Sequence, residues 1–349
     1  MNALKLTAYF AERQRSGGRF LAESMLEEFA QRRVAVSVML RGISGFGHQR
    51  IIRTDQSLSL SEDPAVAIAA VDRPEVISAL AGDVAAMTGS GLLTLERARL
   101  IDGTTTPADM PGDAVKLTVY VGRNRRHDGV PAYKAVCDLL HRNGFAGASV
   151  FLGVDGTAHG ERRRARFIAR NVDVPLMIIA IGSAEQVRAS SAELGTLIDR
   201  PLVTVERVRL VSQERGRPPV LPDVDATGRP LWQKLMVFTS EASRHDGLPI
   251  HRALVRRIWE SGAASGATVL RGIWGFHGDR EPHGDKLIQF GRQVPVMTVI
   301  VDTPSNIART FEIVDAITGR DGLITCETVP ALLAIDGADR RGGLDLADT

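Results

Sequence analysis

Lys5-Leu-Thr-Ala-Tyr9 is repeated twice further along the chain, as Lys116-Leu-Thr-Val-Tyr120 and as Lys234-Leu-Met-Val-Phe238. A glycine stands thirteen residues after each lysine, at positions 18, 129 and 247. Two further anchors follow in the same order: a strand-like run that ends in Arg-Gly or Leu-Gly, and a closing strand that ends in glutamate (Leu93-Thr-Leu-Glu96, Val203-Thr-Val-Glu206, Ile324-Thr-Cys-Glu327). Such recurrence predicts three diverged copies of one unit of about 100 residues.

Each copy has the same pattern of secondary structure. Leu4, Leu6 and Ala8 alternate with other residues, which is typical of a half-buried strand, and Leu21 and Met25 begin a series at helical spacing. Third strands are expected at 65–70, 176–181 and 296–301, and a second helix and a last strand follow each of them. The order βαββαβ predicts an α+β fold made of three ferredoxin-like units.

The unit boundaries follow from the linkers. We expect unit 1 at residues 1–101, unit 2 at 115–211 and unit 3 at 233–335, joined by polar, aperiodic linkers at 102–114 and 212–232. The tail 336–349 resembles a disordered segment. One face of each sheet is covered by its own helices, so the other face must be buried by a neighbour. A ring with approximate three-fold symmetry buries all three bare faces, whereas an open row leaves one sheet face exposed to solvent.

Composition narrows the class of protein. Of 349 residues, 43 are Lys or Arg and 41 are Asp or Glu, a balance that gives little support for nucleic-acid binding. No apolar run approaches the roughly 20 residues that cross a bilayer, so direct membrane insertion is not expected. Cys137 and Cys326 are too few for a disulfide framework, and the N-terminus lacks the pattern of a signal peptide. We therefore expect a cytoplasmic protein.

Four short motifs carry a family resemblance: Arg41-Gly-Ile-Ser-Gly45-Phe46-Gly47, Arg271-Gly-Ile-Trp-Gly275-Phe276, Arg126-His-Asp-Gly129 and Arg244-His-Asp-Gly247. They resemble the bacterial domain of unknown function 190 family, which belongs to the PII-like signalling proteins. The resemblance implies a trimeric ferredoxin-like ring whose inter-subunit clefts bind small effectors, often adenine nucleotides. It also implies that a loop after the second strand engages a partner protein, frequently a membrane transporter or an enzyme. Three units in one chain make that trimer covalent.

The Arg-Gly segments are candidate ligand sites. Glycines let backbone N–H groups approach an anion, and arginine binds phosphate in a bidentate manner. The predicted ligand-binding residues are Arg41, Gly42, Gly45, Phe46, Gly47 and Arg50 in unit 1, and Arg271, Gly272, Gly275, Phe276 and His277 in unit 3. Arg126, His127, Arg244 and His245 join them because they precede helix N-termini, which attract anions. The alternatives are an exposed loop in which Phe46 packs locally, and helix capping by Asp128 and Asp246.

Unit 2 departs from this pattern. It has Leu152-Gly153 in place of Arg-Gly, and its loop carries Glu161-Arg-Arg-Arg164-Ala-Arg166, which could contact an acidic partner or phosphates or be a solvated strand face. If each cleft draws loops from two neighbours, only the cleft between units 3 and 1 keeps the motif on both sides. We expect that cleft to bind best.

Other functional classes have weaker support. His277, His283 and Asp285 suggest a metal site, but surface histidines on a loop are the favoured interpretation. Glu62-Asp63-Pro64 is interpreted as turn chemistry, and no nucleotide-hydrolase, serine-hydrolase or zinc-protease motif occurs, so no enzyme is predicted. The sequence favours a regulatory protein that senses an anionic effector. The alternatives are an interaction module without a ligand and an enzyme that acts on a phosphorylated small molecule.

Overall fold

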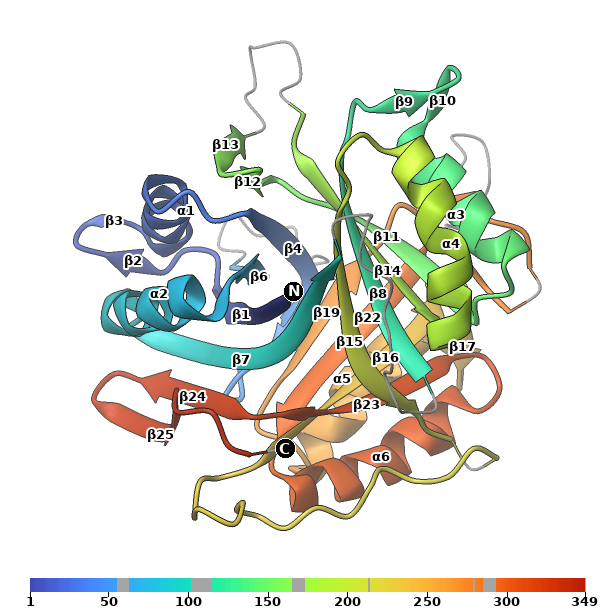
Figure 1. Cartoon of the computed structure of the whole chain (residues 1–349). Coiled ribbons are helices and arrows are strands. Elements are labelled where there is room, and N and C mark those ends of the chain that lie inside the picture. Colours follow the sequence, from blue (N-terminus) through green and yellow to red (C-terminus); the bar gives the residue numbers. More distant parts are fainter. Residues whose placement is uncertain are drawn as a thin grey trace.

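The computed structural model describes residues 1–54, 63–101, 114–164, 173–212, 214–278, 280–284 and 293–348. Residues 102–113 of the predicted linker, Glu62, Arg166 and Asp285 lie outside these ranges. Within them, no helix has the length and apolar composition needed to cross a bilayer. The mixture of helices and strands and the three repeated units confirm the predicted fold class (Figure 1).

The three units contain equivalent elements in the same order. Unit 1 consists of β1 (Asn2–Ala11), β2 (Arg15–Ser16), β3 (Arg19–Phe20), α1 (Leu21–Gln31), β4 (Val36–Phe46), β5 (Arg53–Thr54), β6 (Ala65–Asp72), α2 (Pro74–Met87) and β7 (Ser90–Ile101). Unit 2 consists of β8 (Ala114–Gly122), β9 (Arg126–His127), β10 (Val130–Pro131), α3 (Ala132–Arg142), β11 (Gly147–Leu152), β12 (Asp155–Ala158), β13 (Glu161–Arg164), β14 (Pro175–Gly182), α4 (Ala184–Leu197) and β15 (Leu202–Leu210). Unit 3 consists of β16 (Trp232–Ser240), β17 (Arg244–His245), β18 (Leu248–Pro249), α5 (Ile250–Ser261), β19 (Ala267–Arg271), β20 (Trp274–His277), β21 (His283–Gly284), β22 (Pro295–Asp302), α6 (Pro304–Thr318), β23 (Leu323–Val329), β24 (Ala331–Asp336) and β25 (Asp339–Gly343).

The four main strands of each unit pair in one antiparallel order. In unit 1 this order is β4-β6-β1-β7, and units 2 and 3 repeat it as β11-β14-β8-β15 and β19-β22-β16-β23. The helices of each unit lie on the outer side of its sheet, and the three sheets converge toward the middle of the molecule (Figure 1). This is the ring that the bare sheet faces predicted.

Four hydrophobic cores match this arrangement. One core in each unit lies between the helices and the outer sheet face, as with Leu6, Met25 and Leu80 in unit 1. The fourth core is shared, and units 1, 2 and 3 contribute residues such as Val71, Ile179 and Val299 from their inner sheet faces. Because side chains alternate between the two faces of a strand, one set packs into the core of its own unit and the other set packs into the central core.

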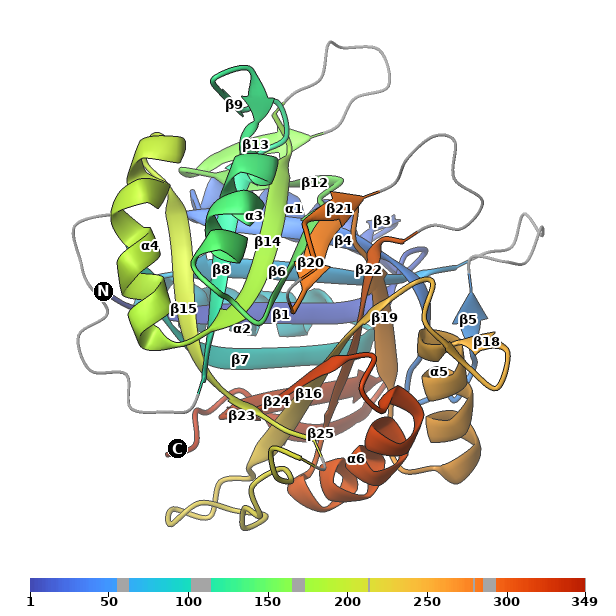
Figure 2. The same cartoon turned by 90° about the vertical axis from the view of Figure 1, so that its right-hand side faces the viewer.

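Each unit extends its second strand onto a neighbour. Residues 42–46 of β4 pair with β19 of unit 3, β20 pairs with β11 of unit 2, and β12 pairs with β4 of unit 1. Figure 2 shows β20 and β21 beside the strands of unit 2. Phe46 is thereby buried in the helix-covered core of unit 3, and Phe276 is buried in that of unit 2. The three units are interlocked in a cycle by these exchanges.

One local prediction and one alternative interpretation were wrong. The tail from residue 336, expected to be disordered, forms a hairpin in which β25 pairs with β24, because Leu333 and Ile335 of β24 are buried in the core of unit 1. Asp128 and Asp246 do not cap helices, since Pro131 and Pro249 occupy the N-cap positions. Both aspartates have positive φ angles and precede a glycine in the tight β9–β10 and β17–β18 turns, a sequence that favours a two-residue hairpin loop.

Candidate ligand clefts between the units

A cleft between units 3 and 1 has a volume of about 590 Å³. Unit 1 lines it with Tyr9, at the end of β1, and with the Gly45-Phe46-Gly47 segment. Unit 3 lines it with Trp232, with the start of β19, and with the hairpin of β24 and β25. Cavities that hold small organic ligands are typically of this size and combine aromatic walls with a few polar groups.

Polar contacts hold the mouth of this cleft together. The Gln49 side-chain amide donates to Asp336 across the interface, with 3.1 Å between nitrogen and oxygen. The Arg341 guanidinium lies over the Trp232 ring, 5.3 Å from its centroid. Burial raises the pKa of the Tyr9 phenol to about 12, so Tyr9 presents a neutral hydroxyl at physiological pH.

The equivalent cleft between units 2 and 3 is much smaller, about 50 Å³. Gly275, Phe276 and His277 line it from unit 3. The Phe276 ring meets His141 edge to face at 5.0 Å between centroids, and Lys134 lies over Trp274 at 4.1 Å. Burial, and then the charge of Arg280, lower the pKa of His277, so its imidazole is favoured in the neutral form. Phe276 thus belongs both to the lining of this second cleft and to the aromatic contacts beside it.

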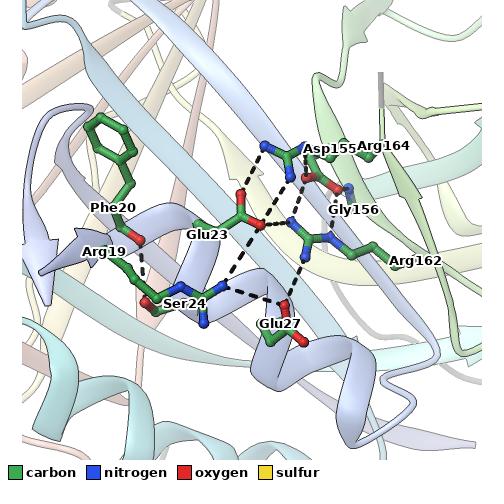
Figure 3. A network of polar contacts seen from close by, with 9 residues as sticks. All are labelled: Arg19, Phe20, Glu23, Ser24, Glu27, Asp155, Gly156, Arg162 and Arg164. Atoms are coloured by element: carbon green, nitrogen blue, oxygen red, sulfur yellow. Dashed lines mark hydrogen bonds and ion pairs between the residues drawn. The ribbon is translucent and has the colours of Figure 1, made fainter. Parts of the chain in front are cut away.

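The interface between units 1 and 2 carries an ion-pair network instead (Figure 3). Arg162 contacts Asp155 at 2.8 Å between nitrogen and oxygen, and reaches Glu23 and Glu27 of α1 at 3.4 and 3.5 Å. Arg164 contacts Glu23 at 2.9 Å. Two arginines of the predicted basic run therefore have an acidic partner within the chain itself. Networked arginine–carboxylate pairs fix geometry more firmly than isolated surface pairs do.

The predicted arginines lie apart from the clefts. Arg41 donates to Glu12, and Arg271 donates to Glu241 with 2.7 Å between nitrogen and oxygen. Each therefore neutralises a carboxylate just beyond the first strand of its own unit. Arg50 lies over the Trp259 ring of α5, which donates its indole N–H to the Arg50 carbonyl. The arginines of the motif serve packing between and within units.

The glycines of the motif serve close approach between backbones. A Cβ atom on Gly45 would lie 2.5 Å from the carbonyl oxygen of Ala267, and one on Gly275 would lie 2.2 Å from that of Ala148. Gly42 and Gly272 would bring a Cβ atom within 2.9 Å of a carbonyl oxygen. Of the predicted residues, Gly45, Phe46 and Gly47 line the larger cleft and Gly275, Phe276 and His277 line the smaller one.

The remaining predicted residues belong to the short hairpins. The Arg126 guanidinium donates to the Gly129 carbonyl at 2.7 Å, and His127 lies 3.5 Å from Asp128. His245 lies 3.4 Å from Asp246 in the equivalent turn, which follows Arg244. These residues are outside the linings of the two clefts. Each cleft also draws on one motif only, since each second strand extends to a single neighbour.

The repeated lysines and glutamates, which carried the repeat, meet at the centre of the molecule. Lys5, Lys116 and Lys234 alternate with glutamates in a closed ring of ion pairs, which we call the Lys–Glu ring: Lys5–Glu96–Lys234–Glu327–Lys116–Glu206. Within each unit the lysine faces its own glutamate across two paired strands. Each lysine also contacts a glutamate of a neighbouring unit, so the ring joins all three units.

Burial and charge act against each other in this ring. All six side chains are at most 11% exposed, and burial by itself disfavours charge. Nevertheless, the surrounding lysines lower the pKa of Glu96 and Glu206, and the glutamates raise the pKa of Lys5 and Lys234. Burial lowers the pKa of Lys116. We take Lys116 as charged because Glu206 and Glu327 contact its ammonium at 2.9 and 2.7 Å.

The same carboxylates meet the spacing of a metal site, since those of Glu96, Glu206 and Glu327 lie within 4.8 Å of one another. Three lysine ammonium groups already supply the counter-charge there. The Lys–Glu ring was not predicted from the sequence, although a lysine and a glutamate at inward positions of apolar strands in all three copies were a usable signal. Tyr9, Trp232 and Arg341 were not predicted as cleft residues either.

Comparison with known proteins agrees with the repeat. The family model described as DUF190, Uncharacterized ACR, COG1993, matches residues 3–100, 114–210 and 232–331. A UPF0166 protein of Aquifex aeolicus (strain VF5) is 37% identical over 99 residues, which are 28% of this chain and 90% of that protein. The relative therefore corresponds to one unit. The chain belongs to the domain of unknown function 190 family and contains three tandem copies of its domain.

Proposed function

We propose that this protein is a PII-like regulatory protein that binds a small anionic effector in the cleft between units 3 and 1. The observation that carries the proposal is the contrast between the clefts, about 590 Å³ at this interface and about 50 Å³ at the equivalent one. At the interface of units 1 and 2, arginine–carboxylate pairs join the two units. A single chain then has one principal site, and adenine nucleotides are the effectors to test first.

The proposal concerns binding and regulation in the cytoplasm, and it assigns no catalytic residue. A regulated partner, such as a membrane transporter or an enzyme, would read the occupied state from loops near the cleft. The resemblance to PII-like proteins supports this part of the proposal. We propose neither direct insertion into a membrane nor contact with nucleic acid.

Calorimetric titration with ATP, ADP and AMP tests the binding site. We expect one site per chain for at least one nucleotide, together with a rise in melting temperature, because a ligand that binds only the folded state stabilises it. Three equivalent sites per chain would contradict the assignment to one cleft. No binding and no thermal shift with any of these nucleotides would favour the alternative, an interaction module without a ligand.

A variant in the cleft localises the binding. Gly47 lines the cleft, and a Cβ atom there meets nothing within 4 Å, so Gly47→Leu starts a side chain in open space at the cleft. We expect it to weaken nucleotide binding at least tenfold while the melting temperature of the free protein stays within a few degrees. The matched control is Gly82→Leu, because Gly82 lies on α2 with equally open space and is outside the cleft lining. Equal binding by both variants would place the site elsewhere.

A further inference from the structure

The C-terminal hairpin, residues 331–343, is an addition of unit 3 that lies almost entirely beyond the family match, which ends at residue 331. Its first strand, β24, pairs with β7 of unit 1 along its whole length, from Ala331 opposite Leu95 to Asp336 opposite Ser90. Figure 1 shows the hairpin beside β7. Its tip is held by unit 1 as well, because the Gly337 N–H donates to the Gly89 carbonyl at 2.9 Å.

The two faces of this hairpin differ. Leu333 and Ile335 pack into the helix-covered core of unit 1, whereas Leu332 and Ala334 face the central core and line the cleft. In the register of the hairpin, Arg341 is opposite Ala334 and Arg340 is opposite Ile335. Both arginines line the cleft, and Arg341 lies beside Ala334 on the face that also carries Leu332.

Arg341 is positioned for ligand contact. Its guanidinium lies over the Trp232 ring, and both residues line the cleft. Gly342 follows with a φ of +85°, and a Cβ atom there would lie 2.1 Å from the Leu332 carbonyl oxygen, so a glycine keeps the strands close beside the tryptophan. Stacking on an aromatic ring fixes the guanidinium plane while its N–H groups remain able to donate.

We propose that the C-terminal hairpin is the anion-recognising wall of this cleft, with Arg341 receiving the phosphate of a phosphorylated, ring-containing ligand. The inference rests on the proposed function and adds to it the residue that selects for charge. A ligand held between Arg341 and the Gly45-Phe46-Gly47 segment contacts units 3 and 1 at once. Occupation of the cleft therefore also holds the hairpin against β7.

The test compares Arg341 with Arg320, an exposed arginine of unit 3 outside the cleft lining; replacing either one removes one positive charge. Arg341→Ser and Arg320→Ser are titrated with ATP and, separately, with adenosine, which lacks phosphate. We expect Arg341→Ser to weaken ATP binding roughly 10- to 100-fold, the usual loss for a charge-assisted hydrogen bond, and Arg320→Ser to change it less than threefold. Adenosine binding should be the same in both variants, because neither arginine is assigned to the ring of the ligand.

The possible outcomes separate the role of Arg341 from the location of the binding site and from the proposed function. If ATP binds the wild-type chain and both variants lose affinity equally, the effect is bulk charge and the assignment to Arg341 fails. If neither variant loses affinity but Gly47→Leu does, the cleft is confirmed and the hairpin is excluded as its anion-binding wall. If the wild-type chain binds none of the nucleotides, the proposed function and this inference fail together.

A second measurement tests whether ligand binding stabilises the hairpin against β7. Hydrogen exchange of the amides in β24 and β7 is followed with and without saturating ATP. We expect slower exchange at residues 90–95 and 331–336 in the wild-type chain, and no such slowing in Arg341→Ser at the same ATP concentration. Equal slowing in both proteins would show that the ligand stabilises the hairpin without Arg341, and would overturn the inference.

Discussion

The stability of the Lys–Glu ring depends on the balance between its positive and negative side chains. Each lysine contacts two glutamates, so the removal of one member leaves two partners with one counter-ion each. Buried charges cost several kcal/mol each to desolvate, and only their mutual contacts offset that cost. A net charge of zero in the ring is therefore the condition for its stability.

Lys116→Met should unfold the protein at markedly lower urea concentration. Glu206 and Glu327 would keep one lysine each, and the ring would carry a net negative charge in a buried place. We expect a loss of about 3–5 kcal/mol in the free energy of unfolding. Arg320→Met is the control, because the Arg320–Glu214 pair is exposed and its loss should cost at most about 1 kcal/mol.

The double variant Lys116→Met with Glu206→Leu separates charge from packing. It restores a net charge of zero, and Lys5 and Glu327 each keep one partner. We expect it to lose less stability than the sum of the two single variants, with a coupling of about 1–3 kcal/mol. Simple additivity would show that the ring members act independently.

Acid should destabilise the ring. The pKa values of Glu96 and Glu206 are lowered in the folded protein, so their stabilisation is fully present above the ordinary glutamate value of about 4.3. It is lost as the pH falls through that value toward the lowered folded pKa. Urea unfolding between pH 6 and pH 3 should therefore show a steeper loss for the wild-type chain than for the double variant. Other carboxylates, such as Asp225, are unchanged in both proteins, so their contribution cancels.

At the scale of the elements, the extended second strands determine how each unit joins its neighbour. The sequence predicted the strands and helices because their apolar spacing is regular, and it located the Gly-Phe segment that reaches the cleft. It could not show that Gly45 and Gly275 lie against the backbone of another unit, because that contact is made between residues more than a hundred positions apart. A glycine needed for close packing and one needed for an anion have the same sequence pattern.

Gly45→Ala and Gly275→Ala test this interpretation. A methyl group in either place overlaps a carbonyl oxygen of the neighbouring unit, at 2.5 and 2.2 Å. We expect each variant to lose about 1–3 kcal/mol of unfolding free energy, the usual cost of overpacking. Gly82→Ala, in open space on α2, should instead gain up to about 1 kcal/mol from helix propensity. Unchanged stability in Gly45→Ala would show that the strand crossing tolerates a Cβ atom.

At the scale of the whole molecule, the sequence predicted the ring, but its reason for preferring the cleft between units 3 and 1 was wrong, because each cleft draws on one motif only. It also did not predict the C-terminal hairpin, which forms one wall of that cleft. Residues 336–343 are polar and rich in glycine, and such composition is shared by disordered tails and tight hairpins. Only the burial of β24 in the sheet of unit 1 distinguishes the two.

The C-terminal hairpin joins units 3 and 1, which no linker of the chain connects directly. Units 1 and 2, and units 2 and 3, follow one another along the chain, but units 3 and 1 are joined only by contacts. Six residues of β24 pair with β7 here, whereas β7 and β15 pair over three residues and β15 and β23 over two. Close to the C-terminus, the Asp348 N–H donates to Asp225 of the linker that precedes unit 3, at 2.8 Å. A longer sheet replaces the missing covalent link.

Removal of residues 331–349 should therefore open one interface before the rest. The deletion exposes the β7 edge at residues 90–95 and removes Leu333 and Ile335 from the core of unit 1. We expect amide exchange to accelerate at least tenfold in that segment, while β14 in unit 2 stays protected because it is paired with β8 and β11 on both sides. Exchange that accelerates equally in β14 would mean that the ring unfolds as one cooperative unit, and that the hairpin stabilises all three interfaces through the shared central core.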